Sequence, residues 1–244
     1  MKTNYIYGRN AVLNAIENNG SLKMIFIDGG AQNDKIIRSA KAKNIPFKIV
    51  SKSTFIKLVG DVKHQGIIAE IEEYRYVSLE KIIEKNKDNP NSLIVLLDGI
   101  EDPHNLGAIL RSVDAFGAQG VIIGANRQVG LNSTVAKVST GAIEYVDVAM
   151  VTNLNQTIQK LKDEGYWIVA SDGEAKLDYR QVDYKDMKTV LIIGSEGFGV
   201  SKLLLKNSDF IVKIPMVGHV NSLNASVACA VFLSQIYSKR NEIK

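Results

Sequence analysis

From residue 93 onward, short apolar segments alternate with segments whose apolar residues recur at helical spacing. Each apolar segment has the length of a single strand, and turn residues separate it from the helical segments on either side. This alternation favours a parallel sheet covered by helices on both faces, because parallel strands need crossover connections. The expected strands are residues 93–97, 120–123, 146–150, 167–170, 190–193 and 210–214, and the expected helices are residues 106–116, 133–140, 154–164, 201–206 and 223–238.

The first 75 residues show a similar alternation with shorter elements, which predicts a small α/β domain. The expected strands are residues 24–27, 46–50 and 67–71. Each expected helix places apolar residues on one face. The first helix lies within residues 5–18 and buries Val12, Leu13 and Ile16; the second is capped by Asp34 and buries Ile36, Ile37 and Ala40; the third lies within residues 51–59 and buries Phe55, Ile56 and Val59.

A polar segment separates these two regions. Residues 72–92 are rich in charge and include Asn-Lys-Asp-Asn-Pro-Asn at positions 86–91, a composition typical of a connection, with one short helix expected at residues 79–85. We therefore expect a first domain at residues 1–75, a linker at residues 76–92 and a second domain at residues 93–244.

The net charge of +4 is distributed unevenly. Residues 1–75 contain 12 Lys and Arg against 7 Asp and Glu, a net of +5; residues 76–92 contain 3 of each; residues 93–244 contain 15 against 16, a net of −1. An excess of positive charge in the first domain suggests contact with phosphates, although a solvated lysine face explains it equally well.

Several functional classes lack support in the sequence. Cys229 is the single cysteine, so no internal disulfide can form, and its apolar helical surroundings favour a role in the core. The three histidines, at positions 64, 104 and 219, do not form a cluster with metal-ligand spacing, so we expect no metal site. No apolar run approaches the roughly 20 residues of a membrane span and no signal peptide is evident, which predicts a cytoplasmic protein without membrane contact.

One candidate functional cluster follows the strand expected at residues 93–97. It comprises residues 98–112, turns at Asp102-Pro103 and enters a helix near Asn105. Arg111 lies six residues later, about 600° around the helix, and so returns to within roughly 120° of Asn105. Arg111 could therefore reach the same crevice as Asn105. Alternatively, Arg111 lies on the helix surface and Asn105 only caps the helix.

The other candidate clusters lie near the end of the chain. Residues 192–199 end an apolar strand in a loop with three glycines around Glu196, and residues 214–226 lead from another strand into an apolar helix, with Ser222 and Asn224 at its entrance. Glycines allow the main chain to approach a ligand closely, and a helix entrance offers free N–H groups. Neither a Gly-x-Gly-x-x-Gly motif after the first strand of this region nor a Walker lysine is present, which argues against dinucleotide and triphosphate binding.

The three clusters occur in a specific order and spacing. They read Asp98-x4-Pro103-x-Asn105-x-Gly107-x3-Arg111-Ser112, then Gly194-x-Glu196-Gly197, then Ile214-Pro215-Met216-x5-Ser222-Leu223-Asn224-x-Ser226. Over residues 93–240 this pattern resembles the three motifs of the SpoU/TrmH branch of the SPOUT RNA methyltransferases. The first domain, with Tyr-Gly-Arg-Asn-Ala-Val at positions 7–12 and His-Gln-Gly at positions 64–66, is similar to the substrate-binding domain of the 23S rRNA guanosine 2′-O-methyltransferases of this branch.

The resemblance implies a fold, a reaction and a set of site residues. It implies a deep trefoil knot in the second domain, S-adenosyl-L-methionine bound in the knot, a homodimer whose interface helps to form the site, and a first domain with the L30e-like RNA-binding fold. The implied reaction is methylation of the ribose 2′-oxygen of a guanosine in 23S rRNA or a ribosomal precursor, without a metal. The implied catalytic residues are Arg111, Asn105, Glu196, Ser222 and Asn224, and the implied cofactor-binding residues are Gly194, Ile214, Leu223, Gly197 and Met216.

Alternatives remain for the role of Arg111 and for the substrate. A guanidinium is a poor proton acceptor at neutral pH, so Arg111 could stabilise a developing alkoxide or hold a phosphate while another group takes the proton. Apolar Ile214 and Leu223 could also be core residues. A tRNA ribose methyltransferase of the same branch, or a noncatalytic rRNA-binding assembly factor that has kept the fold, would carry many of the same residues.

Overall fold

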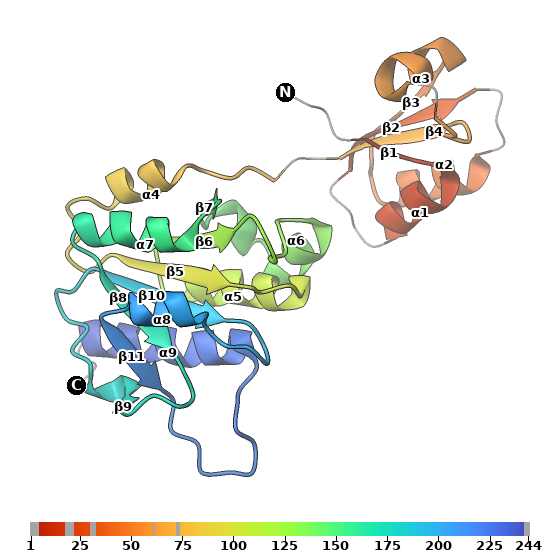
Figure 1. Ribbon diagram of the computed structural model, residues 1–244. Helices are drawn as coiled ribbons and strands as arrows, with labels where there is room; N and C mark the ends of the chain where they lie inside the picture. Colours follow the sequence, from red (N-terminus) through yellow and green to blue (C-terminus); the bar gives the residue numbers. More distant parts are fainter. Residues whose placement is uncertain (1–4, 18–21, 30–32, 61, 72–73, 242–244) are drawn as a thin grey trace. The chain divides into compact units, whose positions relative to one another are not determined.

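The structure, a computed structural model, describes residues 5–17, 22–29, 33–60, 62–71 and 74–241 (Figure 1). The chain divides into two compact units, Met1–Tyr74 with Asn132–Thr134, and Arg75–Leu131 with Val135–Lys244. Residues 76–92, which we expected to form a linker, therefore belong to the second unit. No helix in these described ranges has both the length and the apolar character needed to cross a membrane.

The first unit is built on a mixed sheet. Its strand order is β1-β4-β2-β3, in which β4 pairs antiparallel with β1 and β2, whereas β2 and β3 run parallel. The strands are β1 (Tyr5–Tyr7), β2 (Leu22–Asp28), β3 (Phe47–Val50) and β4 (Ile67–Ile71), and the helices are α1 (Arg9–Glu17), α2 (Asp34–Ala42) and α3 (Lys52–Val59). Apolar residues of α1, α2, β2 and β4 form its core.

Two expectations for this unit were wrong. The N-cap of α2 is Asn33, and Asp34 is the first helical residue. In α3 only Phe55 is buried, because its ring stacks on His64 with 4.5 Å between the ring centroids, whereas Ile56 faces solvent with 61% of its surface exposed. In so short a helix, the apolar pattern did not reveal which face would be covered.

The turn at residues 64–66 forms hydrogen bonds with the starts of two helices, α1 and α2. The side-chain oxygen of Gln65 accepts a hydrogen bond of 3.0 Å from the backbone N–H of Arg9, at the start of α1. Asn33 Nδ2, at the start of α2, donates to the carbonyl of Gly66 at 3.2 Å. His64 Nδ1 accepts from the N–H of Gly66 at 3.0 Å, which tightens the turn. The His-Gln-Gly segment thus has a structural role within the first unit.

The second unit contains a seven-stranded sheet in which the pairs within the sheet are parallel. Its order is β7-β6-β5-β10-β8-β11-β9, so β10, which occurs late in the sequence, lies between β5 and β8. The strands are β5 (Leu93–Asp98), β6 (Gly120–Gly124), β7 (Val148–Val151), β8 (Trp167–Ser171), β9 (Leu177–Asp178), β10 (Thr189–Gly194) and β11 (Phe210–Lys213).

Side chains along the central strands alternate between two cores. In β5, Leu93, Val95 and Leu97 face one core, whereas Ile94 and Leu96 face the other. This is the two-residue period of a strand buried on both faces, and it explains why the central strands are continuously apolar. The sequence pattern therefore identified a sheet covered on both sides.

Helices cover both faces of this sheet (Figure 1). Helices α5 and α9 pack against each other and contribute to one core, while α4, α7 and α8 contribute to the other. The helices are α4 (Leu79–Lys85), α5 (Pro103–Ala115), α6 (Ser133–Ser139), α7 (Leu154–Asp163), α8 (Lys202–Lys206) and α9 (Ala225–Asn241), with short 3-10 helices η1 (Ala142–Glu144) and η2 (Tyr179–Gln181).

The second unit differs from expectation at three places. Helix α4 was expected, but it buries Leu79, Ile82 and Ile83 in the core and is not part of a free connection. Strand β9, only two residues long, carries too little pattern to be recognised in the sequence. The last helix begins at Ala225, two residues later than expected, which leaves residues 223 and 224 in the loop before it.

Candidate active site

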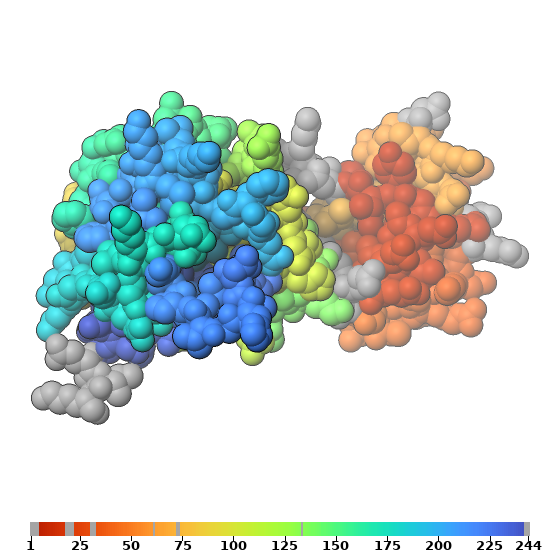
Figure 2. Space-filling model, turned by 60° about the horizontal axis from the view of Figure 1, so that its bottom comes forward, coloured from red at the N-terminus to blue at the C-terminus, as the bar shows by residue number. Residues whose placement is uncertain are grey.

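A cavity of about 800 Å³ opens where β8, β10 and β11 reach their carboxyl ends. Three segments supply most of its lining: residues 171–173 at the end of β8, residues 193–200 around the end of β10, and residues of the stretch 212–225 between β11 and α9. Lys202 and Leu205 of α8 and Ala228 and Phe232 of α9 complete it. Figure 2 shows a hollow among teal, light-blue and dark-blue atoms, the colours of these three segments. The cavity lies at the edge where open parallel sheets bind ligands.

The loop after β10 is closed by its own backbone. The N–H of Gly199 donates to the carbonyl of Ser195 at 2.9 Å, and the N–H of Ser195 donates back to the carbonyl of Gly199 at 3.2 Å. The carboxylate of Asp98, at the end of β5, accepts a 2.7 Å bond from the N–H of Ser201 and fixes the loop's far end. These contacts present Glu196 at a defined position beside the cavity.

Gly194 lies where no side chain fits. A Cβ atom at this position would lie 2.0 Å from the carbonyl carbon of Gly199 and 2.2 Å from the nitrogen of Val200. Both are backbone atoms of the same tight loop, so neither can swing aside. Gly194 is therefore required for the loop to fold back over the end of β10.

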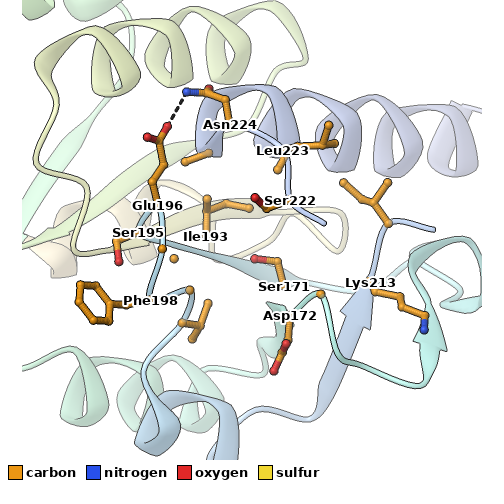
Figure 3. A pocket seen from close by; sticks show the side chains of 18 of the residues that line it. Ser171, Asp172, Ile193, Ser195, Glu196, Phe198, Lys213, Ser222, Leu223 and Asn224 are labelled. Atoms are coloured by element: carbon orange, nitrogen blue, oxygen red, sulfur yellow. Dashed lines mark hydrogen bonds between the residues drawn. The ribbon is translucent and has the colours of Figure 1, made fainter. Parts of the chain in front are cut away.

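Three polar side chains from different parts of the chain meet at the edge of the cavity. The carboxylate oxygen Oε1 of Glu196 accepts hydrogen bonds from Asn105 Nδ2 at 3.0 Å and from Asn224 Nδ2 at 2.5 Å. Asn224 Nδ2 also donates to Asn105 Oδ1 at 2.9 Å. Figure 3 shows Glu196 directed toward Asn224 at the start of α9. We name Asn105, Glu196 and Asn224 the amide–carboxylate network.

Asn224 also begins helix α9. Its Oδ1 accepts hydrogen bonds from the backbone N–H groups of Ser226 at 2.9 Å and Val227 at 3.3 Å, and from the hydroxyl of Ser226 at 2.6 Å. Asparagine is a favoured N-cap because its side-chain oxygen satisfies N–H groups that lack a helical partner. The same residue therefore starts the last helix and holds the carboxylate of Glu196.

The structure places most of the residues expected from the sequence at this cavity. Asn105 is buried and reaches it through the amide–carboxylate network; it does not cap α5, whose cap is Asp102. Ser222 lines the cavity, and its hydroxyl points inward in Figure 3. The five residues expected to bind a cofactor, Gly194, Gly197, Ile214, Met216 and Leu223, all line the cavity.

Arg111 is the exception. It is exposed on α5, does not line the cavity and forms no ion pair or hydrogen bond with any residue that the structure describes, other than within its helix. Six residues separate it from Asn105, about 9 Å along the helix, and its direction differs by roughly 120°. The helical geometry therefore carries its guanidinium away from the cavity of its own chain.

Other residues at the cavity were not recognised from the sequence. Ser171 ends β8 and is followed by Asp172 and Gly173, Phe198 lies within the loop after β10, and Lys202 begins α8 beyond that loop. The hydroxyl of Ser171 points toward the middle of the cavity in Figure 3. One signal was available: Ser171 to Gly173 end a central parallel strand, as the glycine loop does, and such ends meet at one edge of the sheet.

The cavity suits an organic ligand with apolar and polar parts. Ile193, Leu223 and Phe232 supply apolar surface, and Ser171 and Ser222 supply hydroxyl groups. Across residues 5–17, 22–29, 33–60, 62–71 and 74–241, no three His, Cys, Asp or Glu side chains gather as a metal-binding group. A lining of apolar surface with a few polar groups is typical of sites in which main chain and side chains orient a small organic molecule.

Both parts of the chain match known families. Residues 92–234 match the SpoU rRNA Methylase family, and residues 5–77 match the family described as RNA 2′-O ribose methyltransferase substrate binding. A protein of Staphylococcus haemolyticus, assigned by name to the TrmH family of tRNA/rRNA methyltransferases, is 45% identical over 242 residues, which cover 98% of this chain and 96% of that protein.

Solved structures show the same fold. The SpoU methyltransferase AviRb from Streptomyces viridochromogenes, crystallised with the cofactor AdoMet, aligns over 100% of this chain and 92% of its own, with a TM-score of 0.67 and 23% identity. The TrmH/SpoU tRNA modifying enzyme of A. aeolicus aligns over 67% of this chain and 85% of its own, with a TM-score of 0.58 and 30% identity.

Proposed function

This chain belongs to the SpoU rRNA methylase family, and from that premise we propose that it methylates the ribose 2′-oxygen of a guanosine in 23S rRNA with S-adenosyl-L-methionine as methyl donor. The coarser activity, AdoMet-dependent RNA 2′-O-ribose methylation, is that of the family. The observation that carries the proposal is the amide–carboxylate network, which brings residues of all three sequence motifs to the edge of one cavity.

The cavity fits the proposed methyl donor in size and in chemistry. Its volume of about 800 Å³ lies within the range of small-molecule sites, roughly 300–1,000 Å³. Gly194 allows the loop of residues 194–199 to fold back over the end of β10, so that this loop lines the cavity. Ile214, Met216 and Leu223 offer apolar contacts for an adenine ring. We propose that these residues, with Gly197, hold the cofactor, and that Ser171 and Ser222 contribute hydroxyl groups.

The reaction needs little chemistry from the protein itself. When bound, the cofactor supplies a methyl group attached to a positively charged sulfur, which is already activated for transfer. The residues of the chain have to hold the ribose oxygen in line with that group. Asn105 and Asn224 orient Glu196 through Oε1, which leaves Oε2 of that carboxylate available to accept a hydrogen bond from the ribose. We propose Asn105, Glu196, Ser222 and Asn224 as the residues that position the reacting groups.

For Arg111 we propose a role in a second copy of the chain. A groove runs between α9 and α5, the helix that carries Arg111. It is lined largely by small residues, which would allow close packing of helices. In a symmetric dimer formed through this groove, the guanidinium of one protomer could reach the site of its partner and stabilise a developing alkoxide or hold a phosphate. The groove residues are Ala108, Ser112, Tyr179, Ser226, Val227, Ala230, Val231, Ser234 and Gln235.

We further propose that the first unit binds the RNA and that the C-terminal segment forms the trefoil knot of this family. The excess of positive charge in residues 1–75, a net of +5 from 12 basic and 7 acidic residues, supports contact with phosphates. The match of residues 5–77 to a substrate-binding family supports the same role. We propose that the RNA-binding unit ends near residue 75, where the second compact unit begins. We also propose that the protein acts on ribosomal RNA or its precursor in the cytoplasm.

The test is methyl transfer from labelled S-adenosyl-L-methionine to purified RNA. Transcribed 23S rRNA should accept label and become resistant to alkaline cleavage at one position, because a methylated 2′-oxygen cannot attack the neighbouring phosphate. Transfer RNA is the alternative substrate, which the 30% identity to a tRNA modifying enzyme supports. Label in tRNA alone would overturn the 23S assignment, and RNA binding without transfer to either substrate would indicate a noncatalytic assembly factor.

A further inference from the structure

Phe198 is an exposed aromatic residue at the mouth of the candidate active site. It lines the cavity, yet 95% of its surface is exposed. In Figure 3 its ring lies beside Ser195, on the far side of the loop from Ser222 and Leu223. The described residues provide no aromatic partner for this ring. A ring so placed is available to a ligand that enters the cavity from solvent.

The loop holds this ring outward. Gly197 and Gly199, on either side of Phe198, have φ angles of +89° and +65°, which side-chain-bearing residues rarely adopt. The two backbone hydrogen bonds between Ser195 and Gly199 close the loop, and Val200, the residue after it, is buried. Because both flanks are fixed, the ring is presented in advance and needs little ordering when a ligand binds.

A positive charge accompanies the ring. Lys202, the first residue of α8, lines the same cavity and is exposed, and it forms no ion pair with any residue in the described ranges. An aromatic side chain and an ammonium group at one site form a combination by which proteins bind unpaired nucleotides, with the base stacked on the ring and the phosphate near the charge. A purely apolar ligand would gain nothing from the charge of Lys202.

We propose that Phe198 is a stacking platform for an unpaired base of the RNA substrate, at or next to the nucleotide whose ribose is methylated. This inference rests on the proposed function. Glu196 lies two residues before Phe198 in the same closed loop, so a ribose held against the amide–carboxylate network keeps its base, or the neighbouring base, within reach of the ring. Stacking recognises the face common to all bases, so Phe198 positions the nucleotide and does not select its sequence.

The steady-state test compares two replacements of Phe198 with full-length 23S rRNA transcript as substrate. F198L keeps an apolar side chain but removes the π face, and should raise the KM for RNA by about 5- to 150-fold. F198Y restores an aromatic face and should return the KM to within about threefold of the original. The Kd for S-adenosyl-L-methionine, measured by isothermal titration, and the oligomeric state, measured by sedimentation, should not change in F198L.

Each contrary result has a definite meaning. An unchanged KM in F198L would overturn the stacking role. A weaker cofactor affinity of equal size would instead make Phe198 a cover for the cofactor, and dissociation of an oligomer would make it an interface residue; both results reject the proposal.

A binding experiment separates this proposal from the proposed function. The chain contains one tryptophan, Trp167, outside the cavity, so the double variant W167F/F198W carries a single tryptophan at the tip of the loop. Its fluorescence should be quenched when a single-stranded oligoribonucleotide is added, and much less when the same sugar–phosphate chain lacks its bases. If the original protein transfers no methyl group but the quenching requires bases, the proposed function fails and the stacking role stands. Equal quenching by both chains would overturn the stacking role.

Discussion

The amide of Asn224 joins the first turn of α9 to the carboxylate of Glu196. Its Nδ2 donates to Glu196 Oε1 at 2.5 Å, while its Oδ1 accepts from the N–H groups of Ser226 and Val227. The two polar atoms of one amide group thus have different tasks: Nδ2 holds the carboxylate of Glu196, and Oδ1 caps α9. The position of the last helix and the orientation of the carboxylate beside the cavity are therefore linked by one residue.

Replacing Asn224 with aspartate should separate these two tasks. The carboxylate of N224D still accepts from the helix N–H groups, so the free energy of unfolding should change by no more than about 1 kcal/mol. The donor to Glu196 is lost and two carboxylates face each other, which should lower kcat by about tenfold or more. Initial rates and urea unfolding measure both effects.

The control for this variant is Asn153, which caps α7 away from the cavity through a 3.1 Å bond from the N–H of Gln156. N153D retains the cap acceptor and should leave kcat unchanged. Equal activity of N224D and N153D would show that the bond to Glu196 is dispensable.

Gly194→Ala should weaken cofactor binding. Its Cβ would lie 2.0 Å from the carbonyl carbon of Gly199, so the loop carrying Glu196 must move. We expect the Kd for S-adenosyl-L-methionine to rise at least about tenfold, with a loss of stability of roughly 1–3 kcal/mol from overpacking. Isothermal titration and thermal unfolding measure these quantities. Gly218→Ala is the matched control: a Cβ atom there would meet nothing within 4 Å, so this variant should bind the cofactor normally.

Arg111→Ala should remove most methyl transfer and spare cofactor binding. The side chain is exposed on α5 and outside the cavity, so stability should change by less than about 0.5 kcal/mol. If Arg111 acts in the site of its partner, mixing R111A with N105A chains should restore about a quarter of the activity, because half of the dimers are mixed and each has one intact site. No recovery after subunit exchange would contradict action in the partner's site.

Arg240, near the C-terminal end of α9, should stabilise the packing of this helix against the rest of the second unit. Its guanidinium donates to the carbonyls of Asn91 and Met187, both at 2.7 Å, to the carbonyl of Tyr184 at 3.1 Å, and to Thr189 Oγ1 at 3.0 Å. Burial lowers the pKa of Arg240 to about 10, yet the group remains charged at neutral pH.

Removing this guanidinium takes a donor away from the carbonyls of Asn91 and Tyr184, whereas the carbonyl of Met187 still accepts from Thr189 Oγ1. R240A should therefore lower the free energy of unfolding by about 3 kcal/mol, and R240K by less, because an ammonium group lacks the planar fork but still donates. The exposed neighbour Lys239 provides the control, and K239A should change stability by less than about 0.5 kcal/mol. Urea unfolding curves give the comparison; equal midpoints for R240A and K239A would refute the role.

Cys229 should report whether α9 is docked. The thiol is fully buried, and burial raises its pKa from 9.0 to about 12. At pH 9 the native protein should therefore resist alkylation, while the urea-unfolded chain reacts readily. The unfolded chain releases the thiol proton at lower pH than the native protein, so this group makes stability fall as the pH rises between about 9 and 12. Rapid labelling of the native protein would disprove the burial.

Much of the fold could be predicted because apolar patterning and layer geometry agree. Leu93 to Leu97 alternate between two cores, and this requires the continuous apolar run that identified β5. The pattern failed where an element was short or half-covered, as with the two-residue β9 and the exposed Ile56. The strand order, with β10 between β5 and β8, depends on long-range pairing that local patterns do not encode.

The candidate site was predicted in part for a different reason. Glycines and polar residues at strand ends indicate a ligand site, and Gly194, Glu196 and Asn224 lie there as expected. Ser171 and Asp172 were missed because two polar residues at the end of a strand are common in any α/β chain. The roles of Arg111 and Asn105 on α5 could not be separated by spacing, since only the packed structure shows Asn105 turned inward and Arg111 outward.

The position of β10 in the sequence also determines when, during synthesis of the chain, the cavity can be completed. Strand β5 is made early and β10 about a hundred residues later, and residues 214–224, which close the cavity, come later still. During synthesis the growing chain therefore carries a half-built sheet with the edge of β5 open, and it cannot take up a cofactor. The cavity can be complete only after synthesis has passed Phe232, the last residue that lines it. A chain that stops short of this point therefore lacks part of the site.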